Sequence, residues 1–203
     1  IGSFKKPVIL STGMANLEEI RDALNELFFA GLKKEQVTIL HCTTQYPAPY
    51  EDINLRAMET IKNAFNTKIG YSDHSSGIEV SIAAVALGAE VIEKHLTLDR
   101  NLTGPDHKAS IEPDDFLNLV KSIRNISIAL GVKEKKIRNS EIQNLKVARK
   151  SIVAKKSIKR NEIFTEDNIC TKRPGIGISP MEWDKLIGQK SKKDFAKDDL
   201  IEN

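Results

Sequence analysis

Short apolar runs alternate with amphipathic helical segments through the first two thirds of the chain, and this alternation restricts the fold most. The runs cover residues 7–11, 37–42, 68–72 and 90–95, and apolar residues at helical spacing follow each of them, in residues 14–29, 55–64, 79–87 and 116–130. Four consecutive βα units with nearly continuous apolar strands form a parallel sheet whose faces are covered by helices. The sequence therefore predicts an α/β domain over residues 1–131.

The composition changes after this domain. Residues 132–147 are rich in Lys, Glu, Asn and Arg, which is typical of a linker or a solvated helix. Residues 148–203 contain short strand-like pieces at 151–154, 163–164, 169–172 and 200–201, with a helix expected from Pro180. We expect a small β-rich module here, whose thin core favours docking on a larger partner.

Charge and hydropathy exclude two classes of partner. The chain has 31 basic and 28 acidic residues, so its net charge of +3 gives no reason to expect nucleic acid. The longest apolar stretch, residues 80–87, is far shorter than the ~20 residues that span a bilayer.

Cys42 and Cys170 form no paired motif and no signal peptide is visible, which favours a reducing cytoplasm. The start at Ile1 predicts a fragment or a processed product.

Two histidines, His74 and His95, follow neighbouring strands of the predicted sheet. Because ligands bind at the carboxyl ends of parallel strands, the two imidazoles can share one divalent metal ion there. The alternative is that each histidine is a hydrogen-bonded residue of the rim without a metal. Asp73 and Glu93 are candidates for orienting or acid–base groups, and an ordinary ion pair with Lys94 is the alternative for each.

Hydroxyl groups gather at the same strand ends, at Ser11, Thr44 and Ser72. Hydroxyls beside helix N-termini form anion sites, although Ser and Thr also serve as ordinary helix caps. Tyr46 precedes a proline in a rigid loop, where it either closes over a substrate or packs. The long loop 101–110 carries Asp106, a carboxylate able to bind sugar hydroxyls.

Long motifs identify a family resemblance over essentially the whole chain. STGMANLEEI (residues 11–20), HCTTQYPAPYEDINL (41–55), GYSDHSSG (70–77), IEKHLTLD (92–99) and GPDHKAS (104–110) resemble the sialic acid synthase (N-acetylneuraminate synthase) family. Residues 148–183, from ARKSIVAKK to ISPMEW, resemble its C-terminal antifreeze-like (SAF) domain. The resemblance implies the last four βα units of a (β/α)8 TIM barrel followed by that small domain, usually in a domain-swapped homodimer.

The resemblance also implies an activity. Members of the family condense phosphoenolpyruvate with an N-acetylated hexose, typically N-acetylmannosamine, to give N-acetylneuraminate and phosphate. Related synthases make legionaminic or pseudaminic acid and remain open alternatives. The usual metal is Mn²⁺, with Mg²⁺ or Co²⁺ as other possibilities. A metal-dependent aldolase and a non-catalytic sugar-binding or regulatory fragment are the rival readings.

Residue roles follow from the same resemblance, motif by motif. His74 and His95 match metal ligands, and Ser11 and Ser72 match phosphate ligands. The positions that match the sugar site are Tyr46, Glu93, Asp106 and, from a partner subunit, Arg173. We expect catalytic roles for Glu93, His95 and Asp106, with Glu93 the candidate for proton transfer.

Two departures from the family pattern stand out. Thr44 occupies a position where some members carry an Asn phosphate ligand. The match starts at the family's fifth barrel strand, so the acidic and lysine groups that members use on phosphoenolpyruvate have no counterpart here. We therefore expect residues 1–203 by themselves to be inactive.

Overall fold

The computed structural model describes residues 1–202, which divide into two compact units. The first unit covers Ile1–Val132 and the second begins at Lys133. Each unit has its own hydrophobic core, and each is described by itself.

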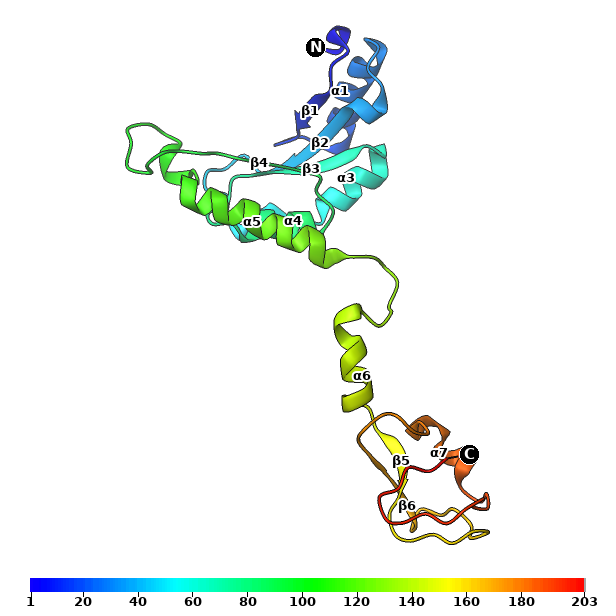
Figure 1. Ribbon diagram of the computed structural model, residues 1–203. Helices are drawn as coiled ribbons and strands as arrows, with labels where there is room; N and C mark the ends of the chain where they lie inside the picture. Colours follow the sequence, from blue (N-terminus) through cyan, green and yellow to red (C-terminus); the bar gives the residue numbers. More distant parts are fainter. Residues whose placement is uncertain (203) are drawn as a thin grey trace. The chain divides into compact units, whose positions relative to one another are not determined.

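The first unit is a parallel sheet with helices against it (Figure 1). Its elements in chain order are β1 Val8–Ser11, α1 Leu17–Phe29, β2 Val37–Cys42, α2 Tyr50–Ile53, α3 Ala57–Phe65, β3 Lys68–Asp73, α4 Glu79–Ala86, β4 Val91–Lys94 and α5 Pro113–Leu130. The strands pair in the order β1-β2-β3-β4, all parallel. The half-barrel of four βα units that the sequence predicted is confirmed, and α2 is an additional short helix that the sequence did not predict.

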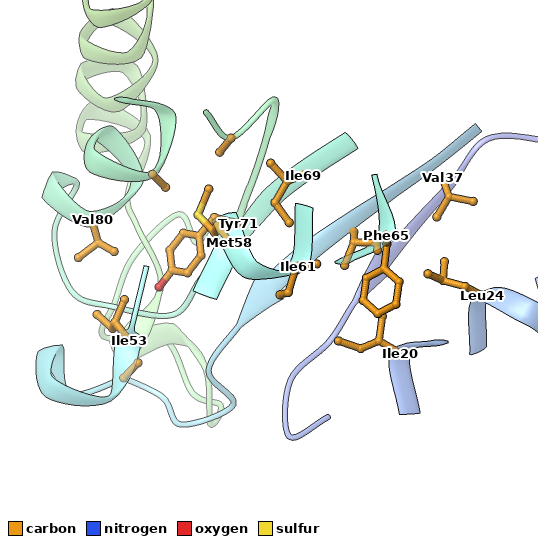
Figure 2. Packing of buried hydrophobic residues seen from close by; sticks show 14 of the residues in the cluster. Ile20, Leu24, Val37, Ile53, Met58, Ile61, Phe65, Ile69, Tyr71 and Val80 are labelled. Carbon is orange, nitrogen blue, oxygen red and sulfur yellow. The ribbon is translucent and has the colours of Figure 1, made fainter. Parts of the chain in front are cut away.

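The strand register divides the side chains between two faces of this sheet. Ile39, Ile69 and Tyr71 belong to the apolar core between the sheet and its helices, on what we call the helix-facing side. Ile69 and Tyr71 are labelled in Figure 2. Ser72 of β3 pairs with Cys42 of β2 on one side and with Glu93 of β4 on the other. Because side chains alternate along a strand, these three residues point away from the helices. We call this second side the open face.

The first helix begins later than its apolar spacing predicts. The sequence placed its start at Met14, whereas α1 starts at Leu17. Met14 has a left-handed φ of 64°, and Asn16 caps the helix by accepting hydrogen bonds from the backbone N–H groups of Glu18 and Glu19 at 2.8 and 3.0 Å. The Glu19 side chain in turn accepts from the Asn16 N–H, so a complete capping box sets the boundary.

The last helix of the unit begins earlier than its apolar stripe indicated. The stripe predicted residues 116–130, and α5 covers Pro113–Leu130. Pro113 fits the first turn, where its missing N–H needs no partner, and Asp114 and Asp115 add favourable charge there. Gly131, at φ 56°, ends the helix.

The second unit contains less regular structure than the sequence predicted. β5 Ser151–Ala154 pairs antiparallel with β6 Ile169–Lys172, and α7 Trp183–Leu186 follows a 3₁₀ turn at Pro180–Glu182. The expected strands at 163–164 and 200–201 form single bridges instead, Ile163 to Lys190 and Leu200 to Val153. The preceding segment, expected as a linker or solvated helix, contains the exposed helix α6 Ile142–Ala148.

Candidate functional site

Three aromatic side chains meet at the carboxyl ends of β2, β3 and β4. The ring centroids of His74 and His95 lie 5.4 Å apart in an edge-on arrangement. The Tyr46 ring lies 3.9 Å from the first and 5.0 Å from the second, so it covers both imidazoles. The structure thus brings together the two histidines and the tyrosine that the sequence singled out separately.

The hydrogen bonds of His74 fix its orientation. Its Nδ1 lies 2.6 Å from the carbonyl oxygen of Thr43, which only accepts, so Nδ1 carries the proton and donates. Nε2 then holds the free lone pair, 3.4 Å from the Ser72 hydroxyl oxygen. Burial lowers the pKa of His74, with the Thr43 carbonyl opposing that shift. A neutral ring with a free Nε2 and a backbone partner on Nδ1 is the form in which histidine binds metals.

Hydroxyl groups beside the histidines converge on one carboxylate. Ser72 donates to Glu93 Oε1 at 2.7 Å, and the Ser11 hydroxyl oxygen lies 3.5 Å from the same atom. These residues come from β3, β4 and β1, so three strand ends contribute to one polar cluster. This arrangement can hold or transfer protons next to an anionic ligand.

Asp73 and Lys94 form an ion pair on the helix-facing side of the sheet, away from this cluster. Their charged atoms lie 3.0 Å apart, and the side chains are 0% and 3% exposed. Because Asp73 alternates with Ser72 along β3, its carboxylate points away from the open face. The ion pair with Lys94, which was the alternative role expected for Asp73, is therefore observed.

The loop that carries Asp106 is fixed at its base. Thr97 Oγ1 lies 2.7 Å from His107 Nδ1, and Ser110 donates to the Asp106 carbonyl oxygen at 2.7 Å. The Asp106 carboxylate is exposed and lies within electrostatic reach of Tyr46. Burial raises the pKa of the Tyr46 hydroxyl, and the negative charges of nearby groups, including Asp106, raise it further. The charge of the Asp106 carboxylate thus acts on the aromatic cluster through Tyr46.

Two predicted site residues lie outside the contacts just described. Thr44 is exposed, and its methyl group lies against Gly13 of the β1–α1 loop, where a Cβ would clash with it. Arg173 belongs to the second unit, where its Nε donates to the Ala148 carbonyl oxygen at 3.0 Å. Within residues 1–202 it is exposed.

The protein residues alone form no complete metal shell. Among residues 1–202, no three His, Cys, Asp or Glu side chains come close enough together to hold a metal ion. A cation at His74 and His95 would therefore need water or substrate oxygens to complete its coordination, which is the pattern of a catalytic site with open positions. Imidazole ligands are typical of first-row transition metals, and the oxygen ligands that would complete the coordination are of the kind that Mn²⁺ and Mg²⁺ accept.

Sequence reasoning missed Cys42 as a member of the site. Its sulfur lies 3.7 Å from His74 Nδ1, and burial raises the pKa of its thiol. The sequence treated this cysteine only as an indicator of compartment. Strict alternation along residues 37–42 would have placed it on the same face as Ser72, its partner in the register.

Within residues 1–202, no helix is long and apolar enough to cross a bilayer.

Comparison with known proteins gives consistent matches. Residues 1–135 match the model of the NeuB family, and residues 149–203 match that of the SAF domain.

Several relatives of this chain are named as synthases of sugar acids. The chain is 53% identical to N,N'-diacetyllegionaminic acid synthase of Campylobacter jejuni over 201 residues, 99% of this chain and 60% of that protein. It is 38% identical to pseudaminic acid synthase of Campylobacter jejuni, across 99% of this chain and 58% of the relative. The chain therefore spans less than two thirds of the length of these relatives.

A solved structure agrees with these matches. The crystal structure of N-acetylneuraminic acid (sialic acid) synthetase from Leptospira borgpetersenii superposes with a TM-score of 0.61 at 40% identity, covering 68% of this chain and 47% of that one. The family model covers residues 1–135, which includes the whole first unit and its half-barrel sheet. The chain belongs to the NeuB family and carries an SAF domain after its half-barrel.

Proposed function

We propose that the protein is a nonulosonic acid synthase, which joins phosphoenolpyruvate to an N-acetylated hexose and releases phosphate. The observation that carries the proposal is the cluster of His74, His95 and Tyr46 beside the hydroxyl–carboxylate contact of Ser72 and Glu93. It combines an oriented imidazole pair with groups able to exchange protons. Membership of a family whose relatives are named as acid synthases supports this reading.

The reaction balances without an oxidant. The enol carbon of phosphoenolpyruvate attacks the sugar aldehyde and forms the new carbon–carbon bond. Water adds to the carbon that bears the phosphate ester, and inorganic phosphate leaves by cleavage of its C–O bond. The protein has to hold the two substrates together, orient the aldehyde and stabilise charge on the leaving phosphate.

His74 and His95 would hold a divalent cation, for which we propose Mn²⁺. The fit rests on the neutral His74 ring, whose Nδ1 is occupied by the Thr43 carbonyl and whose Nε2 is free. Bound there, the cation would supply Lewis-acid polarisation of the sugar carbonyl. Tyr46 covers the imidazole pair from one side and limits the approach of water.

Ser11 and Ser72 would turn their hydroxyl groups from Glu93 to the phosphate of phosphoenolpyruvate. Both lie close to one oxygen of Glu93, so the carboxylate can take up a proton as the hydroxyls reorient. Thr44 would add a further hydroxyl to the phosphate site. Glu93 is the group that we propose for proton transfer.

Asp106 and Arg173 would bind the sugar. The carboxylate of Asp106 stands on the fixed loop near Tyr46 and would accept hydrogen bonds from sugar hydroxyls. Arg173 would reach the N-acetyl group from the second unit of a partner chain in a domain-swapped homodimer, since a guanidinium group suits a carbonyl acceptor.

Two sugars compete as substrate. N-acetylmannosamine, which gives N-acetylneuraminate, is the first candidate. The 53% identity to N,N'-diacetyllegionaminic acid synthase favours the hexose precursor of that product as the second. A side-by-side comparison of kcat/KM for the two sugars decides between them.

Phosphate release by the full-length protein tests the reaction. We expect release that requires phosphoenolpyruvate, an N-acetylated hexose and Mn²⁺ together, with one phosphate formed for each nonulosonic acid. Carbon–carbon bond formation without phosphate release would indicate a metal-dependent aldolase. Sugar binding without turnover would indicate a non-catalytic sugar-binding or regulatory protein. Either result would overturn the proposal.

A further inference from the structure

The ends of β3 and β4 are joined by a buried ion pair that the proposed chemistry does not use. Asp73 and Lys94 are partners in the register of the two strands, and each is the last residue of its strand. Their charged atoms lie 3.0 Å apart with almost no exposure to solvent. A buried ion pair is a poor source of stability, because the cost of removing both charges from water offsets their attraction.

Each charged group also has further hydrogen-bond partners. One carboxylate oxygen of Asp73 accepts from the N–H and the hydroxyl group of Ser75, at 2.9 and 2.6 Å. The other accepts from the hydroxyl group of Ser81 on α4 at 2.5 Å and from Lys94. Lys94 also donates to the Ser75 carbonyl oxygen at 2.7 Å. The network therefore holds β3, β4, α4 and the turn after β3 in one fixed arrangement.

The two histidines of the site come directly after the two members of this pair. His74 follows Asp73, and His95 follows Lys94, just beyond the last paired residues of the strands. The backbone carbonyl of His74 accepts from Ala48 and that of His95 from Ile111, so neither backbone bond links the two histidines to each other. The strand ladder and the Ser72–Glu93 hydrogen bond also join β3 to β4, but the side-chain contact made by the residues directly before the two histidines is the ion pair on the opposite side of the sheet.

We propose that Asp73 and Lys94 are positioning residues that set the separation of the His74 and His95 imidazoles. This inference rests on the proposed function, in which both rings bind one divalent cation. The carboxylate–ammonium contact is made by the residues directly before His74 and His95. Because its hydrogen bonds are directional, it defines the spacing of the strand ends more closely than apolar packing does. Ser81 supports the pair by fixing the rotamer of Asp73.

The test measures Mn²⁺ binding to the full-length protein by calorimetry without substrates, together with thermal unfolding. The double variant Asp73→Asn/Lys94→Met keeps side chains of similar size and removes both charges. We expect Mn²⁺ binding to weaken about 10–100-fold, the range seen when partners of metal ligands are removed. Ser81→Ala, which deletes one hydrogen bond and keeps the charges, should give a smaller loss in the same direction.

Ile61→Val is the matched control, because it loosens the core of the same unit without touching the strand ends. It should lower the unfolding temperature and leave Mn²⁺ affinity unchanged. If the double variant and Ser81→Ala both bind Mn²⁺ as the wild type does, while His74→Ala abolishes binding, the positioning role is wrong and the metal site stands. If His74→Ala binds Mn²⁺ normally, the proposed metal site itself is wrong. A fall in affinity in Ile61→Val equal to that in the double variant would assign the effect to stability and overturn the inference.

Discussion

His74 Nδ1 donates its proton to the carbonyl oxygen of Thr43 at 2.6 Å, and this bond turns Nε2 of the ring toward the open face of the sheet. A backbone carbonyl holds this tautomer without a charged partner. The Nε2 atom is thus oriented by the main chain of the neighbouring β2–α2 loop. Substitution of the Thr43 side chain leaves this carbonyl in place.

Loss of either histidine should remove metal-dependent turnover. His74→Ala or His95→Ala in the full-length protein leaves one imidazole, which is too few protein ligands for a stable site. We expect Mn²⁺ affinity to fall by more than the ~10–100-fold typical of lost supporting residues, with no measurable phosphate release. His41→Gln is the control, since His41 Nε2 bonds the Ile53 carbonyl oxygen and its strand position faces the helices. Normal Mn²⁺ affinity and rate in either alanine variant would refute the ligand assignment.

The buried His74 ring should make folding sensitive to acid. Burial lowers the pKa of this imidazole below its ordinary value of about 6.5, so the unfolded chain binds a proton at a higher pH than the folded one does. The free energy of unfolding should therefore fall as the pH drops below about 6.5, and the fall should level off once the pH is below the folded pKa. Thermal unfolding between pH 7.5 and 5 measures this. His74→Gln should show a smaller decrease over this range, and an identical decrease would contradict the prediction.

Arg173 should act on the sugar and across a subunit boundary. Arg173→Ala in the full-length protein is expected to raise KM for the hexose more than KM for phosphoenolpyruvate, because its guanidinium would bind the N-acetyl carbonyl. Mixing this variant with His74→Ala chains should restore activity in mixed dimers, where one site combines an intact barrel with an intact arginine. Mixtures with no more activity than the separate variants would place the arginine in its own chain's site or outside any site.

Gly70 should tolerate no side chain. A Cβ there would lie 2.5 Å from the Val91 carbonyl oxygen and would clash with Leu40, so β4 or β2 would have to shift. We expect Gly70→Ala to lower the free energy of unfolding by about 1–3 kcal/mol, measured by urea denaturation. Ser127→Ala, on the exposed side of α5, should stay within about 0.5 kcal/mol of the wild type. Equal stabilities of the two variants would show that the strands move apart at little cost.

A protein limited to these 203 residues should be inactive and self-associating. The family resemblance assigns further charged phosphoenolpyruvate ligands to barrel strands that precede this match, and loss of one such group commonly costs about 10²–10³ in rate. β1 and β4 each have one neighbour in the four-stranded sheet, and Ile9 on the open face is 56% exposed. We expect no phosphate release above background and elution ahead of a monomer. Robust turnover would show that the half-barrel assembles a complete site.

The sequence predicted the βα order and the clustering of strand-end residues because apolar periodicity and parallel topology act over whole elements. It left Asp73 open between a site role and an ion pair, because Lys94 becomes its partner only through the register of β3 and β4. It also placed the start of α1 too early, since apolar spacing continues through Met14 while the Asn16 cap decides the boundary. The orientation of His74 depends on the Thr43 carbonyl, a main-chain group that no residue pattern reveals.

The helix-facing core and the polar cluster occupy opposite sides of the same four strands. A substitution at one position of a strand therefore meets the core, and a substitution at the next position meets the polar cluster. Exchanges on the open face can change the chemistry of the cluster while Ile39, Ile69 and their neighbours keep the scaffold intact. A family that makes several related acids on one architecture is the expected outcome of this division.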